Sequence, residues 1–190
     1  MTVREFEQSL AHMDTLASVR DLITDAASEA GVDATLFEEA TIHHSAGLSI
    51  ATALEVFTDA TELRMVNPSF SLIFMGLSSD SPMLSDGEVT ALVQRDMLTE
   101  LTALSPGTAE TYLRTETDPY EFDGDLPFSF ALVDRPAGRS LCLILGDDRN
   151  GMAVVETDTD AAIEWGTELY ERVLEDARPV PPGELLADLD

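Results

Sequence analysis

Short apolar runs separated by turn residues occupy residues 123–157 and are typical of buried strands. Three such runs lie at residues 128–133, 141–145 and 152–155, and each is bounded by Pro, Gly, Asp or Asn. Residues 147–151 carry the turn chemistry of a hairpin, because Asn and Gly tolerate positive φ. The pattern therefore predicts an antiparallel meander of three strands.

An amphipathic helix around Trp165 is expected to close this meander. Its apolar residues recur at helical spacing and are Ile163, Leu169, Tyr170, Val173 and Leu174. Thr157 or Asp158 can cap the helix, because a short oxygen side chain accepts hydrogen bonds from the free N–H groups of the first turn. We expect Trp165 to be a core anchor and not a ligand-stacking residue.

The N-terminal region predicts one long helix over residues 4–30, which Gly31 ends. Its apolar stripe consists of Phe6, Leu10, Met13, Leu16, Val19 and Ile23. This stripe needs a partner, either the body of its own domain or the same helix of a second subunit. We predict a homodimer through residues 4–30, with packing on the chain's own domain as the alternative.

The region between that helix and the meander predicts a βαβ unit. A strand at 40–45, a short helix at 50–56 and a strand at 61–66 follow one another closely, and such units are normally parallel and right-handed. Further expected elements are helices at 70–77, 96–104 and 108–114, a strand at 88–94 and a loop at 115–119. The predicted fold class is α/β (α+β), with a long N-terminal helix, a βαβ-type half with a mixed sheet, and a C-terminal antiparallel meander closed by a helix.

A length of 190 residues allows one domain, or one domain with an appendage. We divide the chain into a linker or dimerisation helix at 1–31, a main domain at 32–178 and an acidic tail at 179–190. The tail begins with a Pro-rich stretch that cannot continue a helix, so we expect it to be poorly ordered.

The charge of the chain is strongly acidic, with 37 acidic residues, 10 basic residues and a net charge of −27. All the basic residues are Arg. Such a surface suits a cytosol with molar salt, where the Debye length falls to about 3 Å, and we predict a halophilic protein. The same charge argues against direct binding of nucleic acid by this chain, because phosphate backbones are bound by Lys and Arg.

The expected location is cytoplasmic. No stretch approaches the roughly 18 apolar residues of a membrane span. The N-terminus also lacks the apolar core of a signal peptide. The single cysteine, Cys142, lies in an apolar run and is predicted to be a buried structural thiol.

Motifs for metal binding or catalysis do not emerge from the sequence. His43 and His44 are neighbours on a predicted strand and point to opposite faces, so they cannot readily chelate one metal ion. No nucleophile elbow, phosphate-binding loop or dinucleotide fingerprint is found. We predict no metal, no cofactor and no catalytic residue.

Polar residues at the end of one predicted parallel strand are the candidate ligand contacts. Arg64, Asn67 and Ser69 lie at or just beyond the strand at 61–66. Ligands in open α/β sheets bind beyond the carboxyl ends of strands, so these side chains are expected to line a pocket. The alternative is a plain turn beside a surface Arg.

A family resemblance rests on five short motifs. They are Phe6-Glu7-x-x-Leu10, Ala40-Thr41-Ile42, Arg64-x-Val66-x-Pro68, Tyr120-x-x-Asp123-Gly124-x-Leu126-Pro127-Phe128, and Val155-Glu156-Thr157-Asp158 leading to Trp165. With these motifs the chain resembles the effector-sensing middle domain of archaeal winged-helix transcriptional regulators, the methanogenesis regulatory protein family, whose relatives abound in halophilic archaea. The resemblance covers residues 5–178 and is most specific over 123–177.

The resemblance implies a non-catalytic regulatory domain that binds an unknown small effector. It adds Tyr120 and Phe128, which belong to a motif, to the candidate ligand contacts. Family members carry a winged helix-turn-helix ahead of this region, and its basic recognition helix is not found in this sequence, so we expect a stand-alone sensor or a truncated reading frame. Two alternatives are a structural dimerisation module without a ligand, and a small hydrolase, for which no activated nucleophile is visible.

Overall fold

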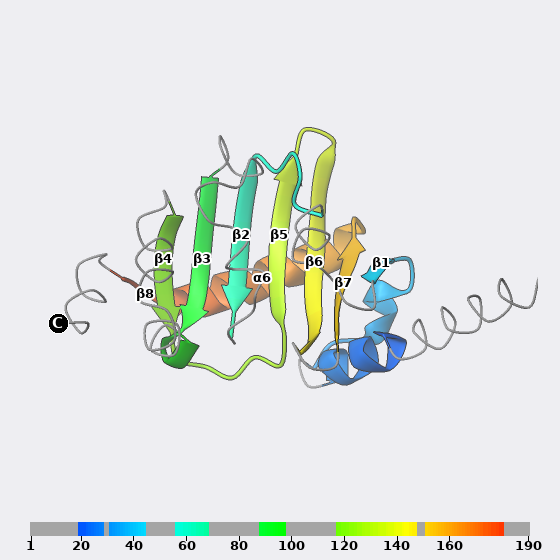
Figure 1. Cartoon of the computed structure of the whole chain (residues 1–190), viewed down its shortest axis with the longest axis horizontal. Helices are drawn as coiled ribbons and strands as arrows, with labels where there is room; N and C mark the ends of the chain where they lie inside the picture. The colour runs from blue at the N-terminus through cyan, green and yellow to red at the C-terminus, as the bar shows by residue number, and fades with distance from the viewer. Residues whose placement is uncertain are drawn as a thin grey trace, which may run out of the picture.

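A mixed β-sheet of eight strands forms the centre of the protein, and helix α6 (Asp160–Glu175) crosses one of its faces (Figure 1). The structure is a computed structural model that describes residues 19–28, 31–44, 56–68, 88–97, 117–147 and 151–180. The strand order is β1-β7-β6-β5-β2-β3-β4-β8. The predicted mixed α/β class is confirmed.

The strands are short to medium in length and run through most of the described chain. Their bounds are β1 Thr41–His44, β2 Glu62–Asn67, β3 Glu88–Gln94, β4 Thr117–Phe122, β5 Ser129–Arg135, β6 Gly138–Asp147, β7 Gly151–Thr157 and β8 Arg178–Pro179. A 3-10 helix, η1 (Ala34–Phe37), precedes β1, and residues 19–28 are helical.

Strands β5, β6 and β7 pair as the expected antiparallel meander, and each is longer than the apolar run that predicted it. The turn between β5 and β6 is tight, because Arg135 pairs with Gly138 across only Pro136 and Ala137. Gly138 has φ +146°, a conformation that side-chain-bearing residues rarely adopt. The β6–β7 hairpin also forms, with Asp147 opposite Gly151.

Helix α6 packs on β6, β5, β2 and β4, and it crosses these strands in Figure 1. Its N-cap is Thr159, and not Thr157 or Asp158 as predicted. The hydroxyl of Thr157 instead accepts a 3.4 Å hydrogen bond from the backbone N–H of Thr159, one step before the helix. Capping preferences therefore located the helix start to within two residues.

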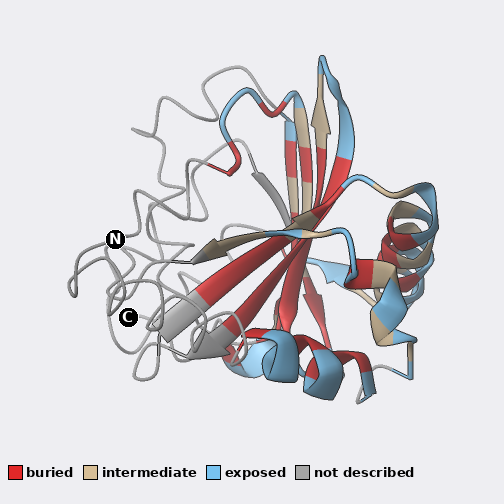
Figure 2. Ribbon diagram, turned by 90° about the vertical axis from the view of Figure 1, so that its right-hand side faces the viewer, coloured by how far each residue is buried: buried red, intermediate tan, exposed pale blue. Residues whose placement is uncertain are grey.

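The strands at the centre of the sheet are largely buried (Figure 2). Two apolar clusters lie on the two faces of the sheet. The cluster under α6 includes Val66, Leu92, Phe130, Leu132, Leu141 and Leu143. The cluster on the opposite face includes Phe57, Leu63, Met65, Val133, Cys142 and Val154. Alternation along each strand sends successive side chains to the two clusters. Cys142 is buried, as its apolar surroundings predicted.

The predicted βαβ unit over 40–66 is wrong. Strand β1 pairs antiparallel with β7 at one edge of the sheet, with Thr41 opposite Glu156. The parallel part of the sheet is β2–β3–β4 instead. An apolar pattern identifies a strand but not its partner, and β1 and β7 are distant in sequence. The helix expected at 50–56 falls almost entirely outside the described residues, as do those at 70–77 and 108–114.

The loop expected at 115–119 is also a misassignment, because β4 begins at Thr117 and contains Pro119. Proline lacks the N–H that a central strand must donate. Here it is tolerated because β8 pairs only with Tyr120 and Glu121, so β4 is an edge strand at Pro119. Residue Val180, just after β8, is 4% exposed. Residues 181–190 lie outside the described part.

The described part of the N-terminal helix, residues 19–28, packs on the chain's own core. Val19 is 2% exposed and Ile23 is 6% exposed, and both belong to the cluster under α6. Phe6, Leu10, Met13 and Leu16 lie outside the described residues, so the dimer stays a prediction.

The helix expected at 96–104 is described only at its start. Residues 95–97 are helical, and residues 98–104 lie outside the described part. Among the described residues no helix is long and apolar enough to cross a bilayer.

Candidate functional site

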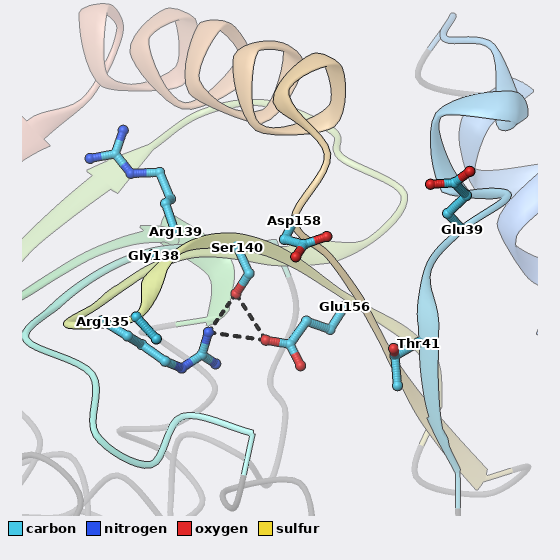
Figure 3. A pocket seen from close by; sticks show the side chains of 9 residues that line it. Glu39, Thr41, Arg135, Gly138, Arg139, Ser140, Glu156 and Asp158 are labelled. Atoms are coloured by element: carbon cyan, nitrogen blue, oxygen red, sulfur yellow. Dashed lines mark hydrogen bonds and ion pairs between the residues drawn. The ribbon is translucent and has the colours of Figure 1, made fainter.

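A cavity of about 300 Å³ opens where the β5–β6 hairpin meets the ends of β7 and β1 (Figure 3). It is lined by Glu39, Thr41, Arg135, Ala137, Gly138, Arg139, Ser140, Glu156 and Asp158. Ligand pockets in proteins have volumes of roughly 300–1,000 Å³, so this cavity is large enough for a small molecule.

Three side chains from three adjacent strands form a polar network in the cavity. Arg135 Nη1 donates to Ser140 Oγ at 2.7 Å and lies 3.0 Å from Glu156 Oε1. Ser140 Oγ donates to the same carboxylate oxygen at 2.9 Å, which closes the triangle seen in Figure 3. Ser140 is 3% exposed, while Arg135 and Glu156 are partly buried. The three groups are thus fixed before any ligand binds.

The network continues to two segments at the rim of the sheet. His43 Nε2 lies 3.1 Å from Glu156 Oε2, so both oxygens of this carboxylate are engaged. Arg135 Nη2 donates to the backbone carbonyl of Val56, in the turn before β2. A change in the position of Arg135 or Glu156 would therefore alter the contacts to His43 in β1 and to Val56 in the turn before β2.

The thiol of Cys142 lies opposite Glu156 in the β6–β7 ladder. Burial, together with the negative charge of Glu156, raises the pKa of Cys142 to about 12. The thiol therefore stays protonated at neutral pH and is a poor nucleophile. Among the described residues no group of three or more His, Cys, Asp and Glu side chains could hold a metal ion.

The four described residues among the predicted ligand contacts do not come together in one site. Arg64 lies under α6, with Nη2 3.3 Å from Asp134 Oδ2 and its guanidinium 5.7 Å from the centre of the Tyr170 ring. Burial raises the pKa of Tyr170 to about 12, which keeps this phenol neutral. Tyr120 is half-buried and packs against the cluster under α6.

Phe128 belongs to the cluster under α6, and Asn67 faces the opposite side of the sheet. Phe128 is buried, with its ring centre 6.2 Å from that of Trp165. Asn67 is fully buried on the opposite face of the sheet, next along β2 after Val66. Ser69 lies outside the described residues. None of the other four, all of them described, lines the cavity beside Arg135.

Sequence reasoning missed the three residues of the polar network. Ser140 and Glu156 occupy positions that face a buried cluster, between apolar neighbours such as Cys142 and Val154. A polar side chain at an inward position of a strand was the available signal. It could not be recognised before the register of the three strands was known.

Residues 49–176 match the family model described as "Methanogenesis regulatory protein FilR1, middle domain". This match spans more than half of the chain, and it places the protein in the class of archaeal transcriptional regulators. The chain belongs to the FilR1 middle-domain family. No curated protein matches the chain.

Several solved structures share the fold at low sequence identity. TrmBL2, an archaeal chromatin protein with a novel mode of DNA binding, gives a TM-score of 0.50 at 11% identity, over 94% of this chain and 68% of that one. Nuc, a phospholipase D family member from Salmonella typhimurium, gives 0.56 at 15% identity, over 74% and 97%. NucT from Helicobacter pylori gives 0.52 at 12% identity, over 74% and 98%. At these identities the likeness concerns the fold alone.

Proposed function

We propose that this regulatory domain senses a small polar effector that binds in the cavity beside Arg135, Ser140 and Glu156, and that it catalyses no reaction. The observation that carries the proposal is the polar network, held in place in a cavity of about 300 Å³. Preformed donors and acceptors in a cavity of this size are typical of ligand sites. Membership of the FilR1 middle-domain family supports the regulatory role.

The same network offers a route from effector to the rest of the domain. An effector that hydrogen-bonds to Arg135 or Glu156 competes with the contacts to Val56 and His43. Binding would then favour a different arrangement of β1 and of the turn before β2. A ligand shifts such an equilibrium only through its different affinity for the two arrangements.

The order of groups in the network supports a non-catalytic role. A serine nucleophile needs a general base beside its hydroxyl to accept the proton, most often an imidazole or an amine. Here the Glu156 carboxylate lies between Ser140 and His43, and Ser140 donates to that carboxylate. The other candidate nucleophile, the Cys142 thiol, is kept protonated by burial. This arrangement weighs against the hydrolase alternative.

A thermal-shift screen in molar potassium chloride tests the proposal. The compounds are amino acids, monocarboxylates, dicarboxylates, polyamines and neutral sugars at millimolar concentration. A ligand at ten times its dissociation constant stabilises by about 1.4 kcal/mol, which raises the midpoint by about 3–5 °C for a chain of this size. We expect at least one compound to give such a shift.

Two matched variants locate the binding. Ala137→Phe places a ring at the lining of the cavity and leaves Arg135, Ser140 and Glu156 unsubstituted, and Ala161→Phe places the same ring on an exposed turn of α6. The shift should vanish in Ala137→Phe and persist in Ala161→Phe. A screen without any hit would favour the dimerisation module without a ligand, and a shift retained in Ala137→Phe would refute the cavity as the site.

A further inference from the structure

Asn67, at the end of β2, has a buried carboxamide without a hydrogen-bond partner. The residue is 0% exposed, and among the described residues neither its Nδ2 nor its Oδ1 atom has a partner. Buried polar groups are almost always hydrogen-bonded, and an apolar side chain of the same size would be more stable at such a position. Stability of the fold therefore does not account for an asparagine here.

The position of Asn67 in the sheet is one where ligands bind. Strands β2, β3 and β4 follow one another in one direction, and the chain then returns to β5 on the other side of β2. The strand order thus reverses at β2, and ligands of open α/β sheets bind at the carboxyl ends of the strands at such a point. Asn67 is the last residue of β2. It faces away from α6, on the same side as Leu63 and Met65.

A second buried polar residue stands beside it. Val66 pairs with Phe130 at the end of the β2–β5 ladder, so Ser129 comes opposite Asn67 and faces the same side. Ser129 is 5% exposed. The carboxyl end of β2 and the start of β5 therefore bring an amide and a hydroxyl together beside the apolar cluster on the face opposite α6.

Charges on this face lie farther away and are already paired. The β3 residue beside Asn67 is Val93, and Glu121 on β4 comes only after it. Glu121 is bound by Arg95, whose Nη2 is 2.7 Å from Oε1, and by Arg178. A ligand group at Asn67 therefore meets a neutral amide, and an ionic group there would lose hydration without gaining a counter-ion.

We propose that Asn67 binds a neutral, planar ligand edge with a hydrogen-bond donor and an acceptor side by side, as in a nucleobase or a carboxamide. The Asn side chain presents the complementary acceptor and donor, and it pairs in this bidentate way with the N6 and N7 edge of adenine. Such a ligand satisfies both orphan atoms at once. This site is separate from the cavity beside Arg135 and does not depend on it.

Two pairs of probes distinguish the sources of this edge. Adenosine is compared with purine riboside, which lacks the 6-amino donor, and nicotinamide is compared with nicotinate, which lacks the amide donor. Calorimetric titrations in molar potassium chloride should show that adenosine or nicotinamide binds at least about tenfold more tightly than its control. This comparison needs only the wild-type chain. Binding of neither probe at millimolar concentration, or equal binding of probe and control, would overturn the proposal.

The variant Asn67→Leu adds a readout of stability. It keeps the number and branching of the side-chain heavy atoms and removes the orphan polar atoms, so its melting midpoint should equal or exceed that of the wild type while probe binding falls at least about tenfold. A lower midpoint would mean that the amide has a structural partner, and unchanged probe binding would place the ligand elsewhere. Ala137→Phe, which blocks the cavity beside Arg135, should leave probe binding unchanged. Loss of binding in that variant would assign the probe to the cavity instead.

Discussion

The close contact between α6 and the sheet at Gly166 makes the consequence of a single methyl group calculable. A Cβ atom on Gly166 would lie 2.8 Å from Leu141 Cδ1 and 3.4 Å from Leu132 Cδ2. Both leucines are 0% exposed, so neither side chain can turn into solvent to make room. The helix therefore depends on glycine at this position for its distance from β5 and β6.

Two opposing effects determine the stability of Gly166→Ala. Alanine favours the helical backbone by about 1 kcal/mol relative to glycine. Overpacking a buried core by a methyl group costs about 1–3 kcal/mol. Because the contact at 2.8 Å is far below normal carbon–carbon distances, we expect the second effect to be larger and the variant to lose about 1 kcal/mol.

Urea denaturation in molar potassium chloride, followed by Trp165 fluorescence, measures this loss. The matched control is the double variant Gly166→Ala, Leu141→Val, in which the shorter side chain makes room for the new methyl group. Its loss should be smaller than the sum of the two single losses, a favourable coupling of about 0.5 kcal/mol or more. A Gly166→Ala variant that is more stable than the wild type, or additive losses, would refute the close packing of α6 on Leu141.

Four further predictions follow from the core, the charge and the family. Trp165 is only partly buried but contacts Phe37 and Phe128. Trp165→Ala should therefore lower the free energy of unfolding by about 2–3 kcal/mol, less than the roughly 3–5 kcal/mol for a fully buried ring. A loss under about 1 kcal/mol, measured by denaturation followed by circular dichroism, would contradict the role of Trp165 as a core anchor. The thermal midpoint should fall as salt is removed, because the screening length grows from about 3 Å at 1 M to about 30 Å at 0.01 M; a constant midpoint would argue against a halophilic protein. The chain should not shift duplex DNA in a gel at physiological salt, given its net charge of −27, and salt-sensitive binding would disprove this. Light scattering in molar salt should detect a homodimer that Leu10→Asp, Met13→Asp disrupts, and a monomeric wild type at about 100 μM, weaker than about −5.5 kcal/mol of association, would exclude it.

Local pairing was predictable from the sequence, and long-range pairing was not. The meander β5–β6–β7 could be inferred because tight turns leave consecutive strands no choice of neighbour. The same apolar pattern could not show that β1 pairs with β7, a strand that is distant in the sequence. Strand β4 was missed because Pro119 resembles a loop signal, and only the short β8 beside it explains the exception.

The residues of the candidate sites also divide into those that the local sequence could place and those that depend on strand pairing. Arg64 and Asn67 were grouped because both lie near the end of one strand, but a separation of three residues places them on opposite faces. That consequence of strand geometry was available from the sequence. The network of Arg135, Ser140 and Glu156 was not, because it requires the register of β5, β6 and β7 to bring the three side chains together.

The most direct test of effector sensing is a calorimetric titration that compares two buried serines. Ser140 belongs to the polar network in the cavity, and Ser129 is equally buried on the neighbouring strand but does not line it. With the compound that stabilises the wild type most, Ser140→Ala should weaken binding at least about tenfold, or about 1.4 kcal/mol, while Ser129→Ala leaves the affinity unchanged. Equal affinity of wild type and Ser140→Ala, or an equal loss in Ser129→Ala, would contradict an effector site beside Arg135, Ser140 and Glu156.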